Sequence, residues 1–454
     1  MKKLIALSLA VLMLLSLAAC GGSAPASSED APGSSETAAA SSETAAPGSD
    51  KTPVTLQCSF VETEWLDAWE KQIKPEFEKE YPWITLEAVA VGGNELEYHT
   101  AHAASNDLPP VMQTDVGGLY FQLVDEGKLL DIRSYDAAEN VPQASLDAYT
   151  YHDVCYGIPQ GNAYSALYLN MAILEQAGWT EAPKDWDEFI QCCRDLQEKT
   201  DTGVITVAGN PVTTTPGWMP FEAILLNAYP DELGGGKFEE LSKKGELNLT
   251  DYPKAIERFD ELASYMMTGS SQNGDDDVIA IMTDGQCAMA IAGNWMAASI
   301  VGGIEEYNGG DPAKARMTPI PFNDPGKTVY IASTPESAIG LAKVDDPNVA
   351  EARDIFFNWM FEPEHFKYLQ NACGTFPVLT NMTSDQLVFP EAVKVFKTEA
   401  DSCSPFFMTF NEYTANVLAE GLSLFDDVFS GNMDAQTAFE KLTEQLKADP
   451  FGEG

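Results

Sequence analysis

The sequence predicts an α/β protein whose folded part is long enough for more than one domain. From about residue 54, strand-like runs alternate with amphipathic helical segments. This alternation is typical of a mostly parallel sheet covered by helices. About 400 residues follow a low-complexity N-terminal stretch, which is enough chain for two or three domains.

The first series of strands and helices begins at Val54. Val54–Phe60 alternates apolar residues as a strand does, and apolar residues then recur at helical spacing until Tyr81-Pro82. A strand is predicted over 84–91, a helix over 95–105, a short buried run over 108–112 and a helix over 119–126.

The second series begins near residues 156–159. Ala166–Asn170 is strand-like, and Met171–Gly178 is a helix that its Gly ends. Asp185 stands at a helix N-cap with Glu188 three residues later, as in a capping box. Further helices are predicted over 253–267, 346–361 and 411–429.

The N-terminus predicts export and a lipid anchor. Lys2 and Lys3 precede the apolar run Leu4–Leu17, which is too short to span a bilayer. Leu17-Ala18-Ala19-Cys20 resembles the bacterial lipobox, which implies a lipoprotein signal peptide over 1–19 and a lipidated Cys20. An ordinary secretory signal that contains a Cys is the alternative.

Residues 20–51 are expected to be the lipidated Cys and a disordered tether. Gly21–Asp50 has no aromatic or large aliphatic residue, so it cannot bury enough apolar surface to fold. We therefore expect the protein on the extracellular face of the cell membrane, held there by its lipid.

The charge balance excludes nucleic acid as a partner. The chain has 26 Lys and Arg against 70 Asp and Glu, a net charge of −44, whereas a phosphate backbone requires clustered basic residues. The cysteines after Cys20 are scattered and odd in number, and they form no C-x-x-C pair. His99 and His102 are interpreted as a solvated helix face, and Asp275-Asp276-Asp277 as a solvated turn. We expect no metal and no cofactor.

The segment Met289–Met296 raises a question about Trp295. Small apolar residues predict a short buried strand, and this strand ends at Gly293-Asn294-Trp295. A large aromatic residue after a Gly that leaves room beside it has two possible roles. It either fills a core or forms a rigid platform for a ligand.

Four stretches follow one another in a distinctive order. One is Pro183-Lys184-Asp185-Trp186-Asp187-Glu188-Phe189, a Pro-x-x-Trp-x-x-Phe motif after a strand and a helix. The others are 108–115 with 125–132, 284–289 leading into 293–295, and 351–360 ending at 374–378. Taken in order, these stretches resemble the extracellular solute-binding proteins of ABC importers, specifically the sugar-binding group related to maltose-binding protein, and the Pro-x-x-Trp-x-x-Phe motif is the most specific of them.

The resemblance implies a two-lobed periplasmic-binding-protein-like fold with a ligand cleft between the lobes. Lobe one would be 52–160 plus 319–372, and lobe two 161–318 plus 373–454. The implied function is to capture a carbohydrate, either a mono- or an oligosaccharide, and deliver it to the permease of an ABC importer. The protein would act as a monomer, would not be an enzyme, and would close its lobes around the ligand.

The site residues follow from the same resemblance. A sugar site combines aromatic platforms with polar side chains. In the family a Trp at the place of Trp295 stacks on the ligand, Asn294 lies beside it, and Asp115 takes the place of a carboxylate from the first lobe. A core Trp and a helix N-cap are the alternatives for Trp295 and Asp115. Six further candidate ligand-binding residues are chosen from their place in the sequence: Glu64, Trp65, Tyr164, Trp218, Phe376 and Asn411.

Some of these assignments leave alternatives open. Trp65 can equally begin the apolar stripe of the following helix. Val116 and Ala163 stand where maltose-binding protein has a basic residue and a carboxylate, so its maltodextrin specificity is not carried over.

Other functions remain compatible with the residues. The same architecture binds polyamines, iron and other small solutes, and an acidic chain with aromatic residues suits a polyamine. A secreted carbohydrate-active enzyme would need two facing carboxylates, which a chain with 70 acidic residues always offers. The sequence has no G-x-S-x-G, H-E-x-x-H or P-loop motif. The two-lobe pattern argues against a surface adhesin.

Overall fold

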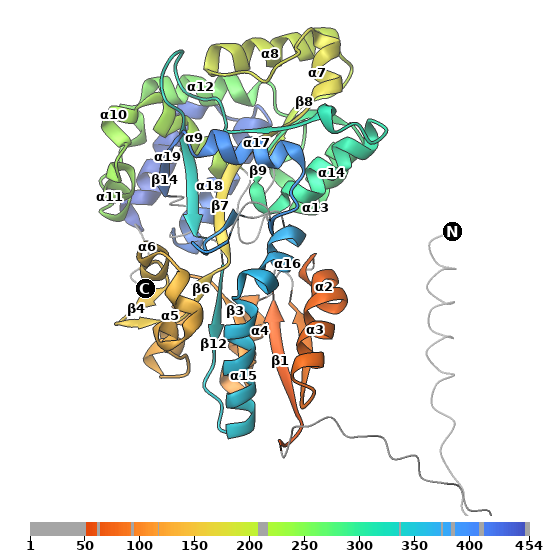
Figure 1. Cartoon of the computed structure of the whole chain (residues 1–454). Helices are drawn as coiled ribbons and strands as arrows, with labels where there is room; N and C mark the ends of the chain where they lie inside the picture. Colours follow the sequence, from red (N-terminus) through yellow and green to blue (C-terminus); the bar gives the residue numbers. More distant parts are fainter. Residues whose placement is uncertain are drawn as a thin grey trace, which may run out of the picture. The chain divides into compact units, whose positions relative to one another are not determined.

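The structure is a computed structural model that describes residues 51–60, 64–91, 95–116, 118–207, 217–335, 337–373, 376–382, 386–407 and 413–449. Residues 51–454 form one compact unit. Figure 1 shows two main β-sheets in this unit, each accompanied by helices. The predicted α/β class is confirmed.

The first sheet has five strands in the order β2-β1-β3-β12-β6. They are β1 (Val54–Phe60), β2 (Ile84–Ala90), β3 (Val111–Thr114), β6 (Ile158–Pro159) and β12 (Ala338–Leu341). β1 is parallel to both β2 and β3, whereas β12 is antiparallel to β3 and β6. The carboxyl ends of β1 and β3 therefore lie at the same edge of this sheet, which is where open α/β sheets place ligands.

Large aromatic side chains join this sheet to its helices. A helical segment follows β1 as α2 (Glu64–Ala68), a π-helical turn (Trp69–Ile73) and α3 (Lys74–Glu80). The ring of Trp69 lies 5.0 Å from that of Phe60 and 5.4 Å from that of Phe356. The other helices are α4 (Glu95–Ser105), α5 (Gly118–Asp125), α6 (Gln143–Asp147), α15 (Pro347–Met360) and α16 (Pro363–Cys373).

The second sheet is built around the long strand β7 (Gly161–Asn170). Its order is β14-β11-β7-β9-β8, and two further strands pair with β7 outside that path. The strands are β8 (Gly203–Val207), β9 (Cys287–Gly293), β10 (Ala315–Thr318), β11 (Tyr330–Pro335), β13 (Phe376–Pro377) and β14 (Ser404–Phe407). The apolar run of β9 is fully buried, as its composition predicts.

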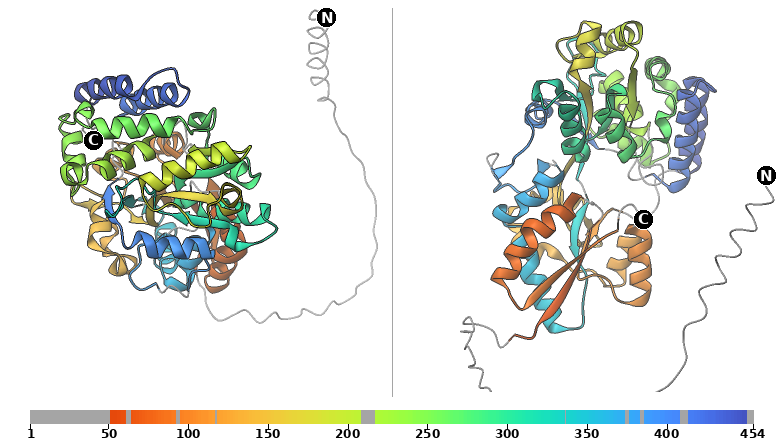
Figure 2. Two further views of the ribbon diagram at one scale, coloured as in Figure 1. Left: turned by 90° about the horizontal axis from the view of Figure 1, so that it is seen from above. Right: turned by 90° about the vertical axis from the view of Figure 1, so that its right-hand side faces the viewer.

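Helices surround the second sheet. The right-hand view of Figure 2 shows the dark-blue C-terminal helices on this half of the unit, where α19 packs against α12 and α18. The helices are α7 (Met171–Ala177), α8 (Trp186–Lys199), α9 (Trp218–Ala228), α10 (Pro230–Leu233), α11 (Lys237–Lys243), α12 (Pro253–Ala263), α13 (Asp275–Thr283), α14 (Ala297–Tyr307), α17 (Glu391–Ala400), α18 (Ala415–Phe429) and α19 (Ala435–Ala448).

Two predicted helix ends are confirmed. Gly178 follows α7 in the left-handed conformation, with φ 97°, which explains why a Gly ends this helix. Asp185 caps α8: its Oδ1 accepts from the backbone N–H of Glu188 at 3.1 Å. The Glu188 carboxylate reaches back and accepts from the backbone N–H of Lys184 at 3.0 Å.

The described chain passes between the two sheets at more than one place, and we call three of these places together the crossing. They lie between β6 and β7 at Gln160, between β11 and β12, and between α16 and β13. The backbone N–H of Gln160 donates to the carbonyl of Ser337 at 3.0 Å, and Gln370 Nε2 donates to the carbonyl of Gln160 at 2.8 Å. The three segments are thus bonded to one another.

One predicted lobe limit, at residue 319, differs from the structure. Residues 319–335 were expected in lobe one, but β11 pairs with β7 and β14 of the second sheet. The chain returns to the first sheet only at β12, because Ser333 and Thr334 lie opposite Tyr164 and Ala163. Val378 and Leu379, which the prediction assigns to lobe two, pack into the core of the first sheet, and the backbone N–H of Thr380 donates to the carbonyl of Asn140 at 2.9 Å. The other lobe limits stay a prediction.

Candidate functional site

The end of β9 lies beside the start of β7, directly after the chain has entered the second sheet. Gly293 is paired with Ser165. Because β9 is antiparallel to β7, Asn294 and Trp295 continue toward the amino end of β7, where Gln160 marks the crossing. A 3₁₀ turn over Asn294–Met296 makes this change of direction and leads into α14.

Asn294 fixes that turn to β7. Its side chain is fully buried. Its Oδ1 accepts from the backbone N–H of Tyr164 at 2.7 Å, and its Nδ2 donates to the carbonyl of Asn162 at 3.1 Å. The predicted polar partner of a ligand therefore makes its hydrogen bonds inside the protein and positions the neighbouring Trp295.

Trp295 is held by a glycine and a carboxylate. It is partly exposed and packs against two hydrophobic clusters. A Cβ added to Gly293 would lie 2.1 Å from the Trp295 ring, so the indole can fold over the backbone only because residue 293 is a glycine. The indole Nε1 donates to Asp275 Oδ2 at 3.2 Å.

Two further predicted aromatic residues lie beside this turn. The ring of Tyr164, half-buried on β7, lies 5.8 Å from that of Phe376 and 6.3 Å from that of Phe396. Strand β13 pairs Phe376 with Asn162. Phe376 is only 2% exposed, so it packs behind Tyr164 and does not offer a surface of its own, contrary to its predicted role.

Asp115 lies on the other side of the crossing. It is exposed and follows β3 directly. Thr114 pairs with Ala338, and Ala338 pairs with Pro159 on its other side, so the end of β3 lies beside the strand that leads to Gln160. The structure thus brings Asp115 and Trp295 to the two sides of one crossing. Because α5 begins three residues later, at Gly118, Asp115 does not take its N-cap position.

A buried polar row supports this end of the first sheet. His99 was expected on a solvated helix face, but its side chain is fully buried. Its Nε2 lies 2.8 Å from Ser59 Oγ of β1, and its Nδ1 lies 3.1 Å from the hydroxyl of Tyr120 on α5. Burial, and then the nearby His102, lowers the pKa of His99 from 6.5 to about 4, so the imidazole is neutral at pH 7.

Two predicted tryptophans lie in the hydrophobic cores. Trp218 is a predicted ligand contact, but it is the first residue of α9 and is fully buried, with its ring 4.9 Å from Tyr413 and 5.1 Å from Phe425. Trp65 is 1% exposed and its ring lies 5.1 Å from that of Phe60, so the alternative of a helix core stripe is right.

Three other predicted positions give no side-chain geometry. Glu64 begins α2, but its side chain lies outside the described residues. Asn411 and Cys20 also lie outside them.

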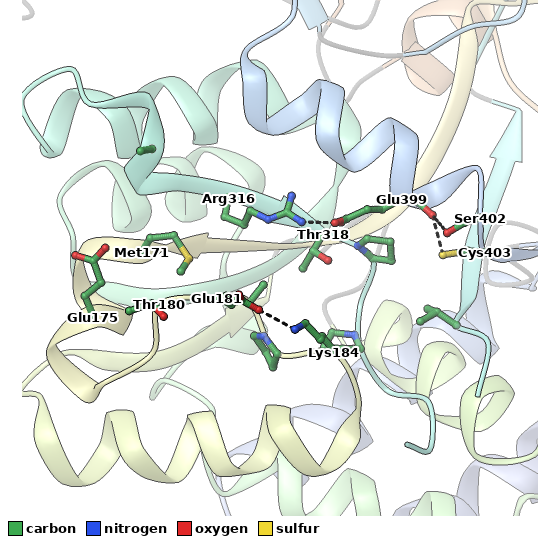
Figure 3. Close-up of a pocket in the computed structure, with 16 residues that line it drawn as sticks. Met171, Glu175, Thr180, Glu181, Lys184, Arg316, Thr318, Glu399, Ser402 and Cys403 are labelled. Atoms are coloured by element: carbon green, nitrogen blue, oxygen red, sulfur yellow. Dashed lines mark hydrogen bonds and ion pairs between the residues drawn. The ribbon is translucent and has the colours of Figure 1, made fainter. Parts of the chain in front are cut away.

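A pocket of about 520 Å³ lies elsewhere on the second-sheet half (Figure 3). It is formed by α7, the loop after α7, β10 and the end of α17, and none of the predicted site residues lines it. Its ionic groups pair with one another: Lys184 lies 2.7 Å from Glu181, and Arg316 bonds Glu399. Because these charges are already neutralised, we place the candidate site at the crossing.

The acidic run 275–277 is the first turn of helix α13, where a solvated turn was expected. Asp277 Oδ2 accepts from the backbone N–H of Gly274 at 3.0 Å and so caps the helix. Within the described ranges, no group of three or more His, Cys, Asp and Glu side chains is placed to hold a metal ion.

The described cysteines are free thiols. Five are buried and Cys403 is partly buried; the five are Cys58, Cys155, Cys192, Cys193 and Cys287. Burial raises the pKa of Cys287 to about 12, so its thiol stays protonated.

Among the described helices, none has the length and apolar character needed to cross a bilayer.

Solved structures share this fold at low sequence identity. A chitin oligosaccharide binding protein superimposes with a TM-score of 0.69 and 19% identity, covering 88% of this chain and 99% of that chain. The maltose-bound MalE3 of T. maritima gives 0.69 and 15%, covering 87% and 99%. RafE in complex with raffinose gives 0.65 and 19%, covering 87% and 100%. The predicted two-lobed binding-protein fold is thereby confirmed.

Sequence comparison identifies the family. An uncharacterized ABC transporter extracellular-binding protein of Pyrococcus horikoshii is 23% identical over 246 residues, which are 51% of this chain and 54% of that protein. The match thus spans about half the length of that relative. The family described as bacterial extracellular solute-binding protein matches residues 61–365, more than half of the chain. The chain therefore belongs to the bacterial extracellular solute-binding protein family.

Proposed function

We propose that the protein is an extracellular receptor that captures a carbohydrate and delivers it to the permease of an ABC importer, without chemical change to the sugar. Family membership supports the receptor role. Several proteins of the same fold are named for sugars, among them chitin oligosaccharide, maltose and raffinose, and this supports the class of ligand.

The observation that supports the proposal most directly is the way in which neighbouring residues hold the Trp295 side chain in place. A sugar ring has apolar C–H faces that lie flat on an aromatic plane, and it has hydroxyl groups at its edge. A partly exposed indole, held over Gly293 and fixed by Asp275, is a rigid plane of this kind. Tyr164, whose backbone N–H bonds Asn294 next to the indole, is a second partly exposed aromatic residue near this turn, and Asp115 across the crossing supplies a carboxylate for hydroxyl groups.

In this proposal the ligand lies at the crossing between two lobes. Lobe one consists of 52–160 plus 337–372, with Val378 and Leu379 packed into its core, and lobe two consists of 161–335 plus the rest of 373–454. The bonded segments at Gln160 act as the hinge, because the described backbone passes between the sheets there. Sugar that contacts both Asp115 and Trp295 favours the closed arrangement, since it binds that state more tightly.

The proposal also places the protein on the outer face of the membrane. Cleavage after Ala19 and lipidation of Cys20 anchor the chain, and residues 21–50 tether the binding unit. The receptor acts as a monomer, because one chain supplies both sides of the crossing.

Thermal unfolding of residues 51–454 tests the class of ligand. The panel contains maltose, raffinose, chitin oligosaccharides, spermidine and divalent metal ions. A ligand at about 100 times its dissociation constant stabilises the native state by roughly 2.7 kcal/mol, which gives a measurable rise in melting temperature. A rise with one of the sugars supports the proposal. A rise with spermidine or a metal ion alone contradicts the sugar assignment, and so does a release of cleaved sugar.

A further inference from the structure

Asp275 is the only described side chain for which a hydrogen bond to the Trp295 indole is resolved. It opens helix α13, twenty residues before Trp295 in the sequence. Its two acidic neighbours have other roles: Asp277 caps the helix through the backbone N–H of Gly274, and Asp276 is exposed to solvent. One carboxylate of this run is therefore directed to the aromatic platform.

Asp275 is itself held on the second sheet. Two residues earlier, Asn273 Nδ2 donates to Thr206 Oγ1 of β8 at 3.0 Å. β8 lies beside β9, with Thr206 opposite Ala290. The segment that leads to Asp275 is thus bonded to β8, and the turn that carries Trp295 follows the adjacent strand β9. The amino end of α13 also favours a negative charge at this position, because the helix dipole is positive there.

The Asp275 carboxylate also acts on the buried strand beneath the indole. Tyr168 donates its hydroxyl hydrogen to the carbonyl of Gly293 at 2.8 Å. Burial, and then the charge of Asp275, raises the pKa of Tyr168 well above its ordinary value, so this phenol remains a donor. The carbonyl of Gly293 under the ring and the indole N–H are thus both held by hydrogen bonds, and the Asp275 charge acts on both donors.

From these contacts we propose that Asp275 is a positioning residue for the aromatic platform: its carboxylate fixes the plane of the Trp295 indole and strengthens the stacking of a sugar on it. The effect on sugar stacking rests on the proposed function, whereas the effect on the position of the ring does not. An ionised acceptor at Nε1 orients the ring and polarises the indole toward a more negative face. A more negative face attracts the polarised C–H groups of a sugar ring more strongly.

The first arm of the test uses no sugar. In ¹⁵N-labelled protein covering residues 51–454, the indole N–H signal of Trp295 is assigned by its loss in Trp295→Phe. We expect hydrogen exchange of this N–H to become about tenfold faster in Asp275→Ala, because the bonded state protects it. Asp275→Asn keeps an acceptor oxygen and should give a smaller change. The matched control Asp276→Asn, which removes an exposed charge one residue away, should leave the exchange rate unchanged.

The second arm is a double-mutant cycle with the panel sugar that binds, among maltose, raffinose and chitin oligosaccharides. Trp295→Phe keeps an aromatic face but has no N–H. We expect Asp275→Ala to weaken sugar binding about tenfold in the original protein and less than about twofold in the Trp295→Phe background. A purely structural role of Asp275 would give the same loss in both backgrounds.

Each outcome decides one of the two claims. Unchanged indole exchange in Asp275→Ala overturns the positioning role, whatever sugar binds. Equal losses of affinity in both backgrounds overturn the contribution to stacking. If none of the sugars binds, the proposed function fails, and the exchange measurement alone decides whether Asp275 positions the ring.

Discussion

At the scale of single residues, the platform depends on Gly293. A methyl group at this position would lie 2.1 Å from the Trp295 ring, inside any permitted contact. We expect Gly293→Ala to push the indole away and to lower the free energy of unfolding by about 1–3 kcal/mol, measured in urea. The control is Gly302→Ala in α14, where no atom lies within 4 Å and the helix should gain slightly. A neutral Gly293→Ala would contradict the described position of the ring.

Asn294 gives a second prediction at this scale. Asn294→Ala leaves the backbone N–H of Tyr164 and the carbonyl of Asn162 without their buried partner. The free energy of unfolding should fall by about 1–3 kcal/mol, because unpaired buried polar groups are destabilising. Asn432→Ala at an exposed position is the control and should change it little. Equal effects in the two variants would argue against the bridging role.

The sequence points to some residues of the candidate site and not to others, and their role in binding stays a prediction. Trp295 could be found because a Gly and a strand of small residues precede it. Asp275 could not, because nothing local indicates that a helix start twenty residues away reaches the indole. The assignments of Trp65 and Trp218 failed for a related reason: their burial depends on Phe60, Tyr413 and Phe425, which only the tertiary fold brings to them.

At the scale of elements, periodicity predicts most of the first sheet. Strand Val54–Phe60 and helix Glu95–Ser105 have the expected limits. Strand β7 begins five residues earlier than its apolar run, because Asn162 and Ala163 pair with Phe376 of β13 and Thr334 of β11. Partners distant in the sequence extend this strand through polar residues, and a single-sequence pattern does not contain them.

His99 couples three elements and gives a pH prediction. It links α4 to Ser59 of β1 and Tyr120 of α5, and its pKa is about 4 in the fold against 6.5 for an ordinary histidine. Between pH 4 and pH 6.5, the unfolded chain binds more protons at His99 than the folded protein does. The free energy of unfolding therefore falls as the pH falls from about 6.5 to 4. The full loss is up to about 3 kcal/mol.

Urea unfolding at several pH values checks this prediction. His99→Gln has no titrating group at this position, so its stability should lose this part of the pH dependence. An unchanged pH profile in His99→Gln would show that other groups cause the acid sensitivity.

At the scale of the whole molecule, two sheets meet at a crossing of three bonded segments. Sequence resemblance predicts this architecture, and the solved structures of the same fold confirm it. The resemblance does not predict every lobe limit correctly. The composition of β11 fits either sheet, and its pairing with Tyr164 and Ala163 shows that it belongs to the second.

This arrangement predicts a change of shape on binding. Small-angle scattering of residues 51–454 should show a smaller radius of gyration with a bound panel sugar than without it, because the lobes close on the ligand. Addition of the same sugar to Trp295→Ala should leave the radius unchanged. Binding by the original protein at constant radius would contradict closure while leaving the sugar site in place.

The most direct test of the central claim is a calorimetric titration of the panel sugar into the original protein and into Trp295→Ala. If the indole is the sugar platform, the variant should bind about 100-fold more weakly, a loss of roughly 2.7 kcal/mol, when both proteins are titrated at a temperature at which each is folded. Equal affinity of the two proteins for the sugar would contradict the account.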